Sequence, residues 1–285
     1  MRLVTFDAGH GPRAGLLSED RIHDVWDALG HPPAAGASLR SVFEAGRLEE
    51  CSDAVSGESI ALSEARLLPP VPDPQKIICI GLNYRSHAAE AGQEAPQAPT
   101  FFAKFANALA PAGTEVALPA YSDKVDYEAE VAFVIGRRCK DVSEGDAVDH
   151  IAGYTLLNDL SARDFQFMTP QWMPGKVFDG SAPCGPALVT PDEAGPPDGI
   201  EIALELNGET MQSASTSELI HSIPALVAHL SKLMTLEPGD IVSTGTPDGV
   251  GSVREPRVWL QPGDHVVVSS PTLGGLQTTL TAAAP

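Results

Sequence analysis

The feature that most constrains the fold is a series of short apolar segments that begins near residue 76. Each segment is β-branched or apolar and is bounded by Gly, Pro or Asp, which is typical of β-strands. They are KIICIGLNY, EVAFVIG, IAGYTLLND, IEIALELNGE, DIVSTGTP and DHVVVSS. One clear amphipathic helix interrupts them, IPALVAHLSKLM at 223–234. Because strands and helices do not alternate, we predict an α+β, mainly-β domain and not a parallel βαβ sheet.

A proline-rich stretch, LLPPVPDPQK, separates this region from the N-terminal part of the chain. Proline fixes φ and lacks an N–H group, so four prolines within six positions predict a stiff connector. We therefore predict a small N-terminal α+β domain over 1–70 and a larger domain over 75–285. Near the start, GHGPRAG lacks the G-x-G-x-x-G spacing and no helix follows it, so it predicts a hairpin turn and not a dinucleotide site.

Composition narrows the partners and the compartment. The chain has 285 residues, is 43% hydrophobic and carries a net charge of −20, so it can bury a sizeable core but repels polyanions. We predict neither a nucleic-acid nor a membrane partner. Four widely spaced cysteines form no CxxC motif and favour a reducing compartment. No signal peptide is evident, and no apolar run approaches the roughly 20 residues that cross a bilayer, so we predict a cytoplasmic protein.

Three carboxylates alternate through VDYEAEVAFVIG at 125–136: Asp126, Glu128 and Glu130. Alternate residues of a strand share one face, so the three like charges repel unless a cation lies between them. Another carboxylate, Asp159, ends the segment IAGYTLLND. Three carboxylates suit Mg²⁺ or Mn²⁺, which prefer oxygen ligands. A solvated acidic strand edge is the alternative, and the residues alone leave both open.

Two further segments carry candidate chemistry. In GLNYRSHAAEAG, His87 and Glu90 are three residues apart and share a face of a helical turn, so Glu90 can orient the imidazole as a general base. The alternative is an ordinary surface pair.

The glycine-rich STGTPDGVG contains Thr246 and predicts either an anion cradle or a plain turn. It lacks the Lys-[Ser/Thr] ending of a P-loop. No G-x-S-x-G occurs, which disfavours a serine hydrolase of the α/β type.

Taken together, these motifs resemble the fumarylacetoacetate hydrolase family over roughly residues 75–280. The resemblance depends on six motifs in order: GLNYRSHAAEAG, VDYEAEVAFVIG, GYTLLNDLSARDFQ, GKVFDGSAPCGPALVT, LNGETMQSASTSELIHSI and LEPGDIVSTGTPDGVG. It implies a rolled, mostly β catalytic domain, usually dimeric, and here the subgroup with an extra N-terminal domain. It also implies one Mg²⁺ or Mn²⁺ per subunit, held by Glu128, Glu130 and Asp159.

The resemblance also implies roles for other residues. The catalytic set is His87 and Glu90, a dyad on a mobile helical lid that acts on water, together with Lys176. The substrate-binding set is Tyr84, Arg163, Gln166 and Thr246. The chain departs from the family pattern at Leu82, where many relatives have Arg, and at Phe105, where many have Pro. Arg85 or Arg163 is the alternative anchor for the substrate carboxylate.

The activity that the resemblance implies is hydrolysis of a carbon–carbon bond in 2,4-dioxo acids such as acylpyruvates, as in aromatic catabolism. Water activated by His87 attacks C4, the C3–C4 bond breaks, and the charge of a pyruvate-type enolate develops beside the cation. The same site suits decarboxylation of oxaloacetate or isomerisation and tautomerisation of a 2-oxo acid. A catalytically silent binding protein is the remaining alternative. The expected partners are a small 2-oxo acid and a second copy of the chain in a homodimer.

Overall fold

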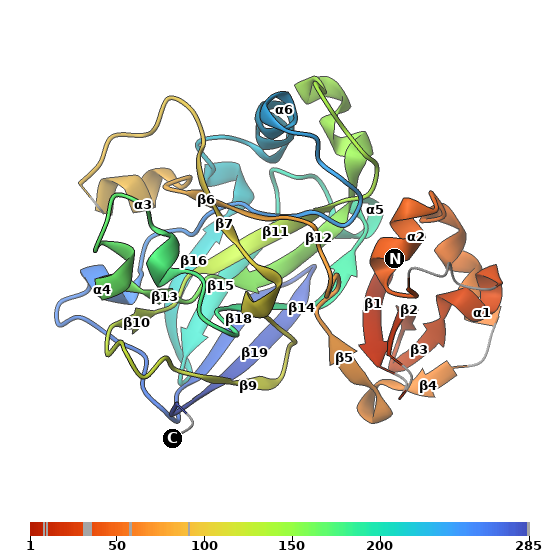
Figure 1. The fold of residues 1–285 in the computed structure, drawn as a ribbon, viewed down its shortest axis with the longest axis horizontal. Helices are drawn as coiled ribbons and strands as arrows, with labels where there is room; N and C mark the ends of the chain where they lie inside the picture. Colours follow the sequence, from red (N-terminus) through yellow and green to blue (C-terminus); the bar gives the residue numbers. More distant parts are fainter. Residues whose placement is uncertain (8, 10, 31–35, 57–58, 91, 284–285) are drawn as a thin grey trace.

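The computed structural model describes residues 1–7, 9, 11–30, 36–56, 59–90 and 92–283 (Figure 1). Its strands in chain order are β1 (Arg2–Asp7), β2 (Pro12–Ser18), β3 (Arg21–Asp24), β4 (Ser59–Ala61), β5 (Arg66–Leu68), β6 (Ile77–Gly81), β7 (Thr100–Lys104), β8 (Leu109–Ala110), β9 (Thr114–Ala117), β10 (Val125–Asp126), β11 (Ala129–Ile135), β12 (Ile151–Asn158), β13 (Ser161–Ala162), β14 (Ala182–Val189), β15 (Glu201–Leu206), β16 (Glu209–Ser215), β17 (Ile241–Ser243), β18 (His265–Ser270) and β19 (Gly274–Thr281).

The helices are short and lie between strands. The α-helices are α1 (Val25–Leu29), α2 (Leu39–Glu44), α3 (Arg85–Glu90), α4 (Arg163–Gln166), α5 (Pro191–Ala194) and α6 (Ile223–Leu233). The 3₁₀ helices are η1 (Glu49–Ser56), η2 (Leu62–Glu64), η3 (Ala106–Ala108), η4 (Glu144–His150), η5 (Met173–Gly175), η6 (Thr216–Glu218) and η7 (Gly251–Val253). The longest α-helix, α6, confirms the helix predicted at 223–234. In the part of the chain that is described, no helix combines the length and apolarity needed to span a bilayer.

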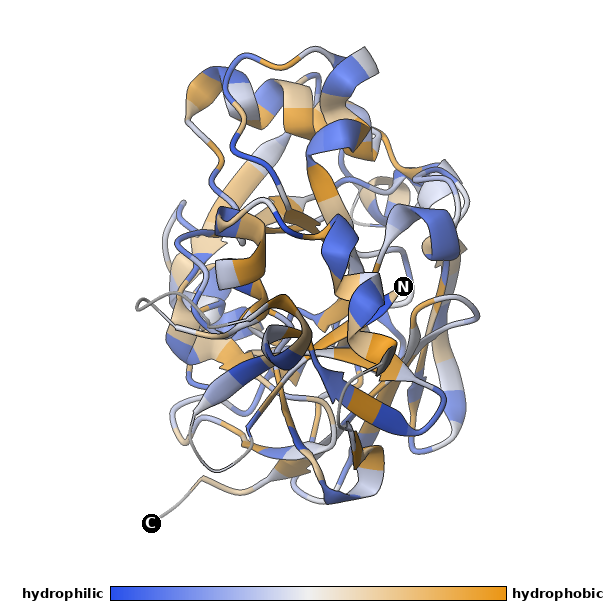
Figure 2. Cartoon of the chain, turned by 90° about the vertical axis from the view of Figure 1, so that its right-hand side faces the viewer, coloured by the Kyte–Doolittle hydropathy of each residue, from blue (hydrophilic) through white to orange (hydrophobic). Residues whose placement is uncertain are grey.

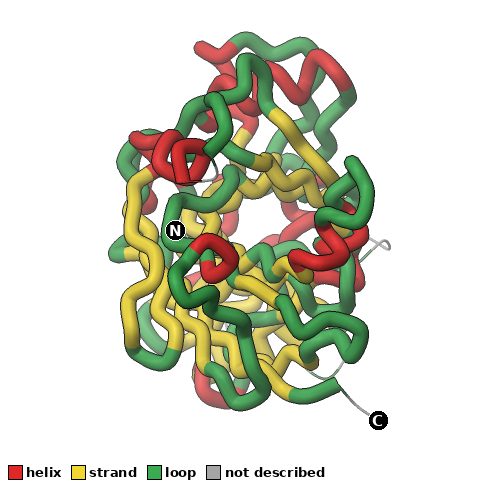
Figure 3. The backbone as a smooth tube through the Cα atoms, turned by 90° about the vertical axis from the view of Figure 1, so that its left-hand side faces the viewer, coloured by secondary structure: helices red, strands yellow, loops and turns green. Residues whose placement is uncertain are grey.

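Two sheets make up the body of the protein. The larger has the strand order β4-β3-β2-β1-β14-β12-β11-β17-β6-β7, with β5 beside β1 and β8 beside β14. The smaller has the order β16-β15-β18-β19-β9. Most neighbours are antiparallel, although β17 runs parallel to β6, β14 parallel to β8 and β19 parallel to β9. Figure 3 shows strands filling the interior with helices around them. The predicted α+β, mainly-β class is confirmed.

Strand β11 shows why the sequence contains an uninterrupted apolar run at 131–135. Its side chains alternate between two cores, because successive residues of a strand point to opposite faces. Val131, Phe133 and Ile135 pack in the core that also contains residues of the smaller sheet. Ala132 and Val134 pack in a second core with residues of the N-terminal helices, which are Val25, Trp26, Leu39, Val42 and Phe43. Both faces of β11 are therefore buried.

The N-terminal segment extends the larger sheet. β1 pairs antiparallel with β14, with Leu3 opposite Leu188, and also with β2, which confirms the hairpin predicted around Pro12. Residues 8 and 10 of that turn lie outside the described residues. Figure 2 views this side of the molecule, where hydrophobic and hydrophilic residues are interleaved along the covering helices. The division into domains at 70–75 remains a prediction, since the two parts share both a sheet and a core.

Candidate active site and metal centre

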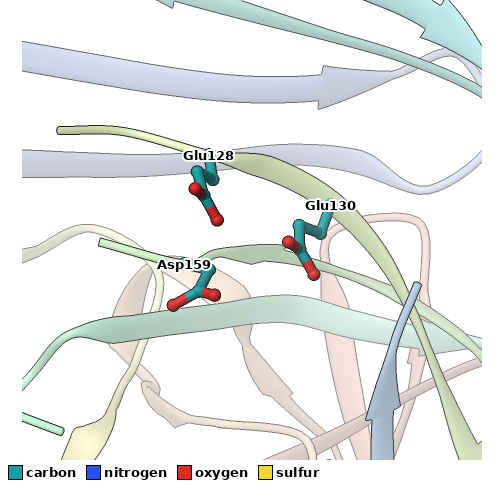
Figure 4. A group of neighbouring side chains, drawn as sticks. All are labelled: Glu128, Glu130 and Asp159. Carbon is teal, nitrogen blue, oxygen red and sulfur yellow. The ribbon is translucent and has the colours of Figure 1, made fainter. Parts of the chain in front are cut away.

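Three carboxylates meet where β11 begins and β12 ends. Glu128 and Glu130 flank Ala129, which lies opposite Asn158 in the ladder, and Asp159 directly follows Asn158. The main-chain N–H of Asp159 donates to the carbonyl oxygen of Glu128 at 2.9 Å, which fixes the two segments together. One carboxylate oxygen from each of the three residues lies within 4.8 Å of the others, and Figure 4 shows the side chains grouped around a common space.

The three carboxylates are buried. Glu128 is 5%, Glu130 2% and Asp159 0% exposed. A solvated acidic strand edge would expose these side chains, so that alternative is wrong. Burying a carboxylate carries a large desolvation cost unless an opposite charge compensates it. The positive charges around the cluster therefore decide whether it also needs a bound metal cation.

Cations from three segments contact two of the carboxylates. Lys176 Nζ lies 2.7 Å from Glu128 Oε2 and 2.8 Å from Asp159 Oδ2. Lys104 Nζ lies 2.7 Å from Asp159 Oδ1, and Arg163 lies 2.6 Å from Glu128 Oε1. Burial by itself would raise the pKa of Glu128, but Lys176 and Arg163 lower that pKa to about 2. Glu128 is therefore ionised at neutral pH.

Glu130 is the member of the cluster for which the described residues provide no cation within ion-pair distance. Its Oε2 accepts hydrogen bonds from the Ser243 hydroxyl and from the Gly245 N–H, the latter at 3.1 Å. Burial, followed by the charges of Asp159 and Glu128, raises the pKa of Glu130 well above its ordinary value. Convergent oxygen donors with one uncompensated charge fit a hard divalent cation such as Mg²⁺ or Mn²⁺.

Asp126 is not among the clustered carboxylates. Its carboxylate accepts from the N–H groups of Gly251 at 2.7 Å and Ser252 at 3.0 Å, and pairs with Arg163 at 2.7 Å. The guanidinium of Arg163 also donates to Gln166 Oε1 at 2.9 Å. Both Arg163 and Gln166 line the cavity described below, but these contacts engage the Arg163 guanidinium with protein groups. Their roles in substrate binding remain predictions.

The predicted dyad lies on α3. His87 Nδ1 is 3.3 Å from Glu90 Oε1, and Glu90 Oε2 accepts from the Gly249 N–H at 2.9 Å. Because a carboxylate only accepts, the contact favours a proton on Nδ1 and leaves Nε2 as the basic nitrogen. Glu90 thus connects the helix to the glycine-rich loop 244–251. In Figure 1, α3 lies near α4, β10 and β13 at the end of the molecule opposite the N-terminal strands.

A cavity of about 440 Å³ opens above the cluster. It is lined by seven of the predicted site residues, which are His87, Glu128, Glu130, Arg163, Gln166, Lys176 and Thr246. Glu90 and Asp159 do not line the cavity but contact residues that do, namely His87 and Lys176. Tyr84 is fully buried and is not among the lining residues. Of the predicted substrate-binding residues, Tyr84 is therefore the one whose position gives its predicted role the least support. No described residue of 1–70 lines the cavity.

Close backbone approaches position the loops that carry the site. A Cβ on Gly175 would lie 2.4 Å from the carbonyl oxygen of Ala162 and 2.5 Å from the nitrogen of Gln166. Only glycine therefore lets η5 approach α4 closely enough to place Lys176 beside Glu128. Gly245 has a φ of +96°, a conformation that glycine adopts without a steric penalty, and this orients its N–H toward Glu130.

Sequence reasoning assigned no role to several residues that shape the site. Gln212 donates to Thr246 Oγ1 at 2.9 Å and accepts from the Ala129 N–H at 2.9 Å, so it connects β16 to both the loop and the carboxylate strand. It lies within one of the quoted motifs, but nothing in the spacing identifies its partners. Phe102 and Trp172 form an edge-to-face pair with centroids 6.0 Å apart. Lys176 Nζ lies 5.0 Å from the Phe102 ring.

Comparisons with known proteins test the family resemblance predicted from the motifs. A family model described as fumarylacetoacetate (FAA) hydrolase C-terminal matches residues 76–281. An oxaloacetate tautomerase of Xenopus laevis, named as mitochondrial, is 39% identical over 97% of this chain and 89% of its own. A fumarylacetoacetate hydrolase from Exiguobacterium antarcticum has a TM-score of 0.88 and 32% identity, covering 99% of this chain and 100% of its own.

A maleylpyruvate hydrolase from Sphingobium sp. SYK-6, solved with manganese(II) and pyruvate, has a TM-score of 0.81 and 31% identity and covers 100% of both chains. The family match spans most of the chain, and the Xenopus relative matches nearly all of it at 39% identity. The resemblance predicted from the ordered motifs is therefore confirmed, and this chain belongs to the fumarylacetoacetate hydrolase family.

Proposed function

We propose that this protein is a divalent-metal-dependent enzyme that interconverts the enol and keto forms of a 2-oxo acid of the oxaloacetate class. The observation that carries the proposal is the buried cluster of Glu128, Glu130 and Asp159 beside a cavity that His87 also lines. The 39% identity to an oxaloacetate tautomerase over nearly the whole chain supports the choice of reaction.

The three carboxylates would hold Mg²⁺ or Mn²⁺ on the cavity side of β11. When bound, the cation would supply Lewis acidity and a template for the carboxylate and keto oxygens of the substrate. Lys176 adds a fixed positive charge within 3 Å of Glu128 and Asp159. This charge favours negative charge that develops on the substrate oxygen in the transition state, which is where stabilisation increases the rate.

Proton transfer is the task of the dyad. Glu90 holds the proton of His87 on Nδ1, so Nε2 can accept a proton and return it. In the enol-to-keto direction, C3 gains a proton and the enol oxygen loses one. The reaction therefore needs a group that carries protons at the cavity wall. We assign that role to His87, and the hydrogen bond from Gly249 keeps Glu90 in place.

Hydrolysis of a 2,4-dioxo acid is the second candidate. It is favoured by the likeness to a maleylpyruvate hydrolase and by the same dyad. His87 would take a proton from water, whose oxygen would attack C4. The C3–C4 bond would break, with C3 taking the electron pair and later a proton, so that one water yields pyruvate and a carboxylic acid. Decarboxylation of oxaloacetate would generate a similar enolate and needs no activated water.

One substrate panel separates these reactions. The protein would be assayed against oxaloacetate and acylpyruvates in the presence of Mg²⁺, Mn²⁺ or a chelator. Ultraviolet absorbance would follow the enol, and mass spectrometry would identify the products. We expect metal-dependent acceleration of oxaloacetate tautomerisation without net product. Pyruvate plus a carboxylic acid from an acylpyruvate indicates hydrolysis, and pyruvate plus CO₂ from oxaloacetate indicates decarboxylation. If no substrate turns over, the protein is a catalytically silent relative and the proposal is wrong.

A further inference from the structure

Glu90 is held by the glycine-rich loop 244–251 more closely than by its partner in the dyad. Its Oε2 accepts from the Gly249 N–H at 2.9 Å, whereas Oε1 lies 3.3 Å from His87 Nδ1. The Glu90 side chain is 22% exposed, so packing alone does not fix it. The direction in which this carboxylate faces the imidazole therefore depends on where the Gly249 N–H lies.

The main chain of Gly249 is in turn held by side chains from two other segments. Its carbonyl oxygen accepts from Arg254 Nε at 3.0 Å and from the Tyr127 hydroxyl at 3.1 Å. Arg254 Nη2 also donates to the carbonyl oxygen of Met211, on β16, at 2.6 Å. Because a guanidinium presents its donors in a rigid planar fork, these two bonds fix the loop relative to β16.

The loop and β16 approach each other closely at this point. A Cβ on Gly249 would lie 2.2 Å from the carbonyl oxygen of Met211. The carbonyl oxygens of both residues accept from one guanidinium, whose positive charge offsets the repulsion between their partial negative charges. Gln212, the next residue of β16, donates to Thr246 Oγ1 at 2.9 Å and so attaches the first half of the loop to the same strand.

Arg254 belongs to a supported part of the chain but not to the cavity wall. It directly follows η7, and its main-chain N–H donates to the carbonyl oxygen of Gly251 at 3.3 Å. The Gly251 N–H donates to the buried carboxylate of Asp126 at 2.7 Å. Arg254 is half-buried and is not among the described residues that line the cavity. It can therefore affect the reaction through the groups that it contacts, and not by touching the substrate.

We propose that Arg254 is a positioning residue for the dyad of His87 and Glu90. By holding the main chain of Gly249 against β16, it fixes the N–H that binds Glu90. Glu90 in turn keeps the imidazole proton on Nδ1 and leaves Nε2 as the base. This inference rests on the proposed function, which assigns proton transfer to His87.

Arg254→Ala in the full-length protein with Mg²⁺ tests the inference by kinetics. We expect kcat for oxaloacetate tautomerisation to fall about 10- to 100-fold, the usual range for outer-shell partners, while KM changes little. Added guanidinium, at concentrations that do not unfold the protein, should restore part of kcat because it can occupy the space of the missing side chain. Sodium chloride at the same concentrations should not.

The tautomer of His87 gives a measurement that does not depend on turnover. In nitrogen NMR spectra of the imidazole at mildly alkaline pH, we expect the proton on Nδ1 in wild type and a mixture of both tautomers in Arg254→Ala. The signals of His87 are assigned by their loss in His87→Ala. Tyr127→Phe removes the second donor to the Gly249 carbonyl oxygen but keeps the ring, so it should shift the tautomers in the same direction by less.

Arg21→Ala is the matched control, because Arg21 also donates to a main-chain carbonyl, that of Ser59 at 2.7 Å, but lies on β3 outside the cavity lining. It should keep the kcat and the tautomer of wild type. An unchanged tautomer in Arg254→Ala, with or without a fall in kcat, would overturn the inference and leave the proposed function intact. If Arg254→Ala does not fold, the tautomer in Tyr127→Phe decides in the same way. A shifted tautomer in a protein whose wild type turns over no substrate would support the positioning role and refute the proposed function.

Discussion

At the scale of single residues, Glu130 distinguishes this site from a closed network of ion pairs. Lys176, Lys104 and Arg163 already compensate Glu128 and Asp159, and a similar contact to Glu130 would have removed the need for a metal. The structure instead gives Glu130 two neutral hydrogen-bond donors. A bound cation would compensate the charge of Glu130, and it therefore explains why three carboxylates are buried together.

Replacing Glu130 tests that explanation. Glu130→Gln keeps the size of the side chain but removes its charge, so we expect Mg²⁺ and Mn²⁺ affinity to fall by more than about 100-fold, the upper range for losing an outer-shell partner. Isothermal titration calorimetry measures the affinity directly. Glu201→Gln, a change at an exposed position of β15, is the control and should bind metal normally. Unchanged affinity in Glu130→Gln would refute the ligand assignment.

The pH dependence of the metal-free protein gives a second test of Glu130. Because its folded-state pKa is raised above the ordinary 4.5, the protonated form contributes stability below that value, and this contribution is lost as pH rises through the folded-state pKa. We therefore expect the free energy of unfolding of Glu130→Gln, relative to chelator-treated wild type, to be higher at pH 8 than at pH 5 when both are unfolded in urea. The same difference in free energy of unfolding at the two pH values would contradict the prediction.

The dyad makes a different prediction about proton position. In Glu90→Gln the amide N–H can donate to His87 Nδ1, which would move the imidazole proton to Nε2 and remove the base from the cavity. We expect kcat to fall by roughly 10²- to 10⁴-fold with little change in KM, the usual contribution of general acid–base catalysis. Steady-state kinetics provides the measurement. The double variant with His87→Ala should be no slower than His87→Ala alone, and additive losses would argue against a coupled pair.

At the scale of elements, the site depends on short connections between strands more than on the strands themselves. Glu128 and Glu130 lie at the start of β11, and Asp159 directly follows β12. Their partners include Lys176 directly after η5, Arg163 in α4 and Gly245 in the loop after β17. Gly175 shows how closely these elements approach one another. The contacts that a Cβ would make there involve backbone atoms, which cannot move away as a flexible side chain can.

Gly175→Ala should therefore displace Lys176 and destabilise the fold. We expect a loss of about 1–3 kcal/mol in the free energy of unfolding, as for overpacked interiors, together with lower activity. Chemical denaturation measures the first effect and the substrate panel the second. Gly145→Ala in η4 is the matched control, because its nearest contact would be Ser143 Oγ at 3.8 Å. If both variants unfold at the same denaturant concentration, the close-approach explanation is wrong.

At the scale of the whole molecule, the N-terminal segment completes the core, and none of its described residues lines the cavity. Its helices cover the face of the larger sheet that carries Ala132 and Val134, and β1 occupies the edge of β14. The other face of β11, which carries Val131, Phe133 and Ile135, packs against the smaller sheet. Glu130 shares the face of Ala132 and Val134, because alternate residues of a strand point the same way. The homodimer expected from the family remains a prediction, as do the cytoplasmic location and the identity of the metal.

Removing residues 1–70 tests this role. The truncated chain would expose one face of the larger sheet, and the lost burial should exceed the roughly 5–15 kcal/mol by which domains are stable. We expect an insoluble or non-cooperatively unfolding product in expression trials and circular dichroism. A soluble truncated protein that unfolds cooperatively and keeps its activity would instead support an independently folded domain at 75–285.

The sequence by itself determined the mainly-β class, the N-terminal hairpin and the membership of the family, because these depend on local patterns and on the order of motifs along the chain. It also suggested Glu128, Glu130 and Asp159 as metal ligands, chiefly through the family resemblance. The structure brings their carboxylates together, and metal binding itself stays a prediction. Only the tertiary structure decided that these carboxylates are buried, that Lys104 and Gln212 support them, and that Arg254 contacts the loop that binds Glu90. Those contacts join residues far apart in the chain, and their energies depend on burial and distance, which no local pattern encodes.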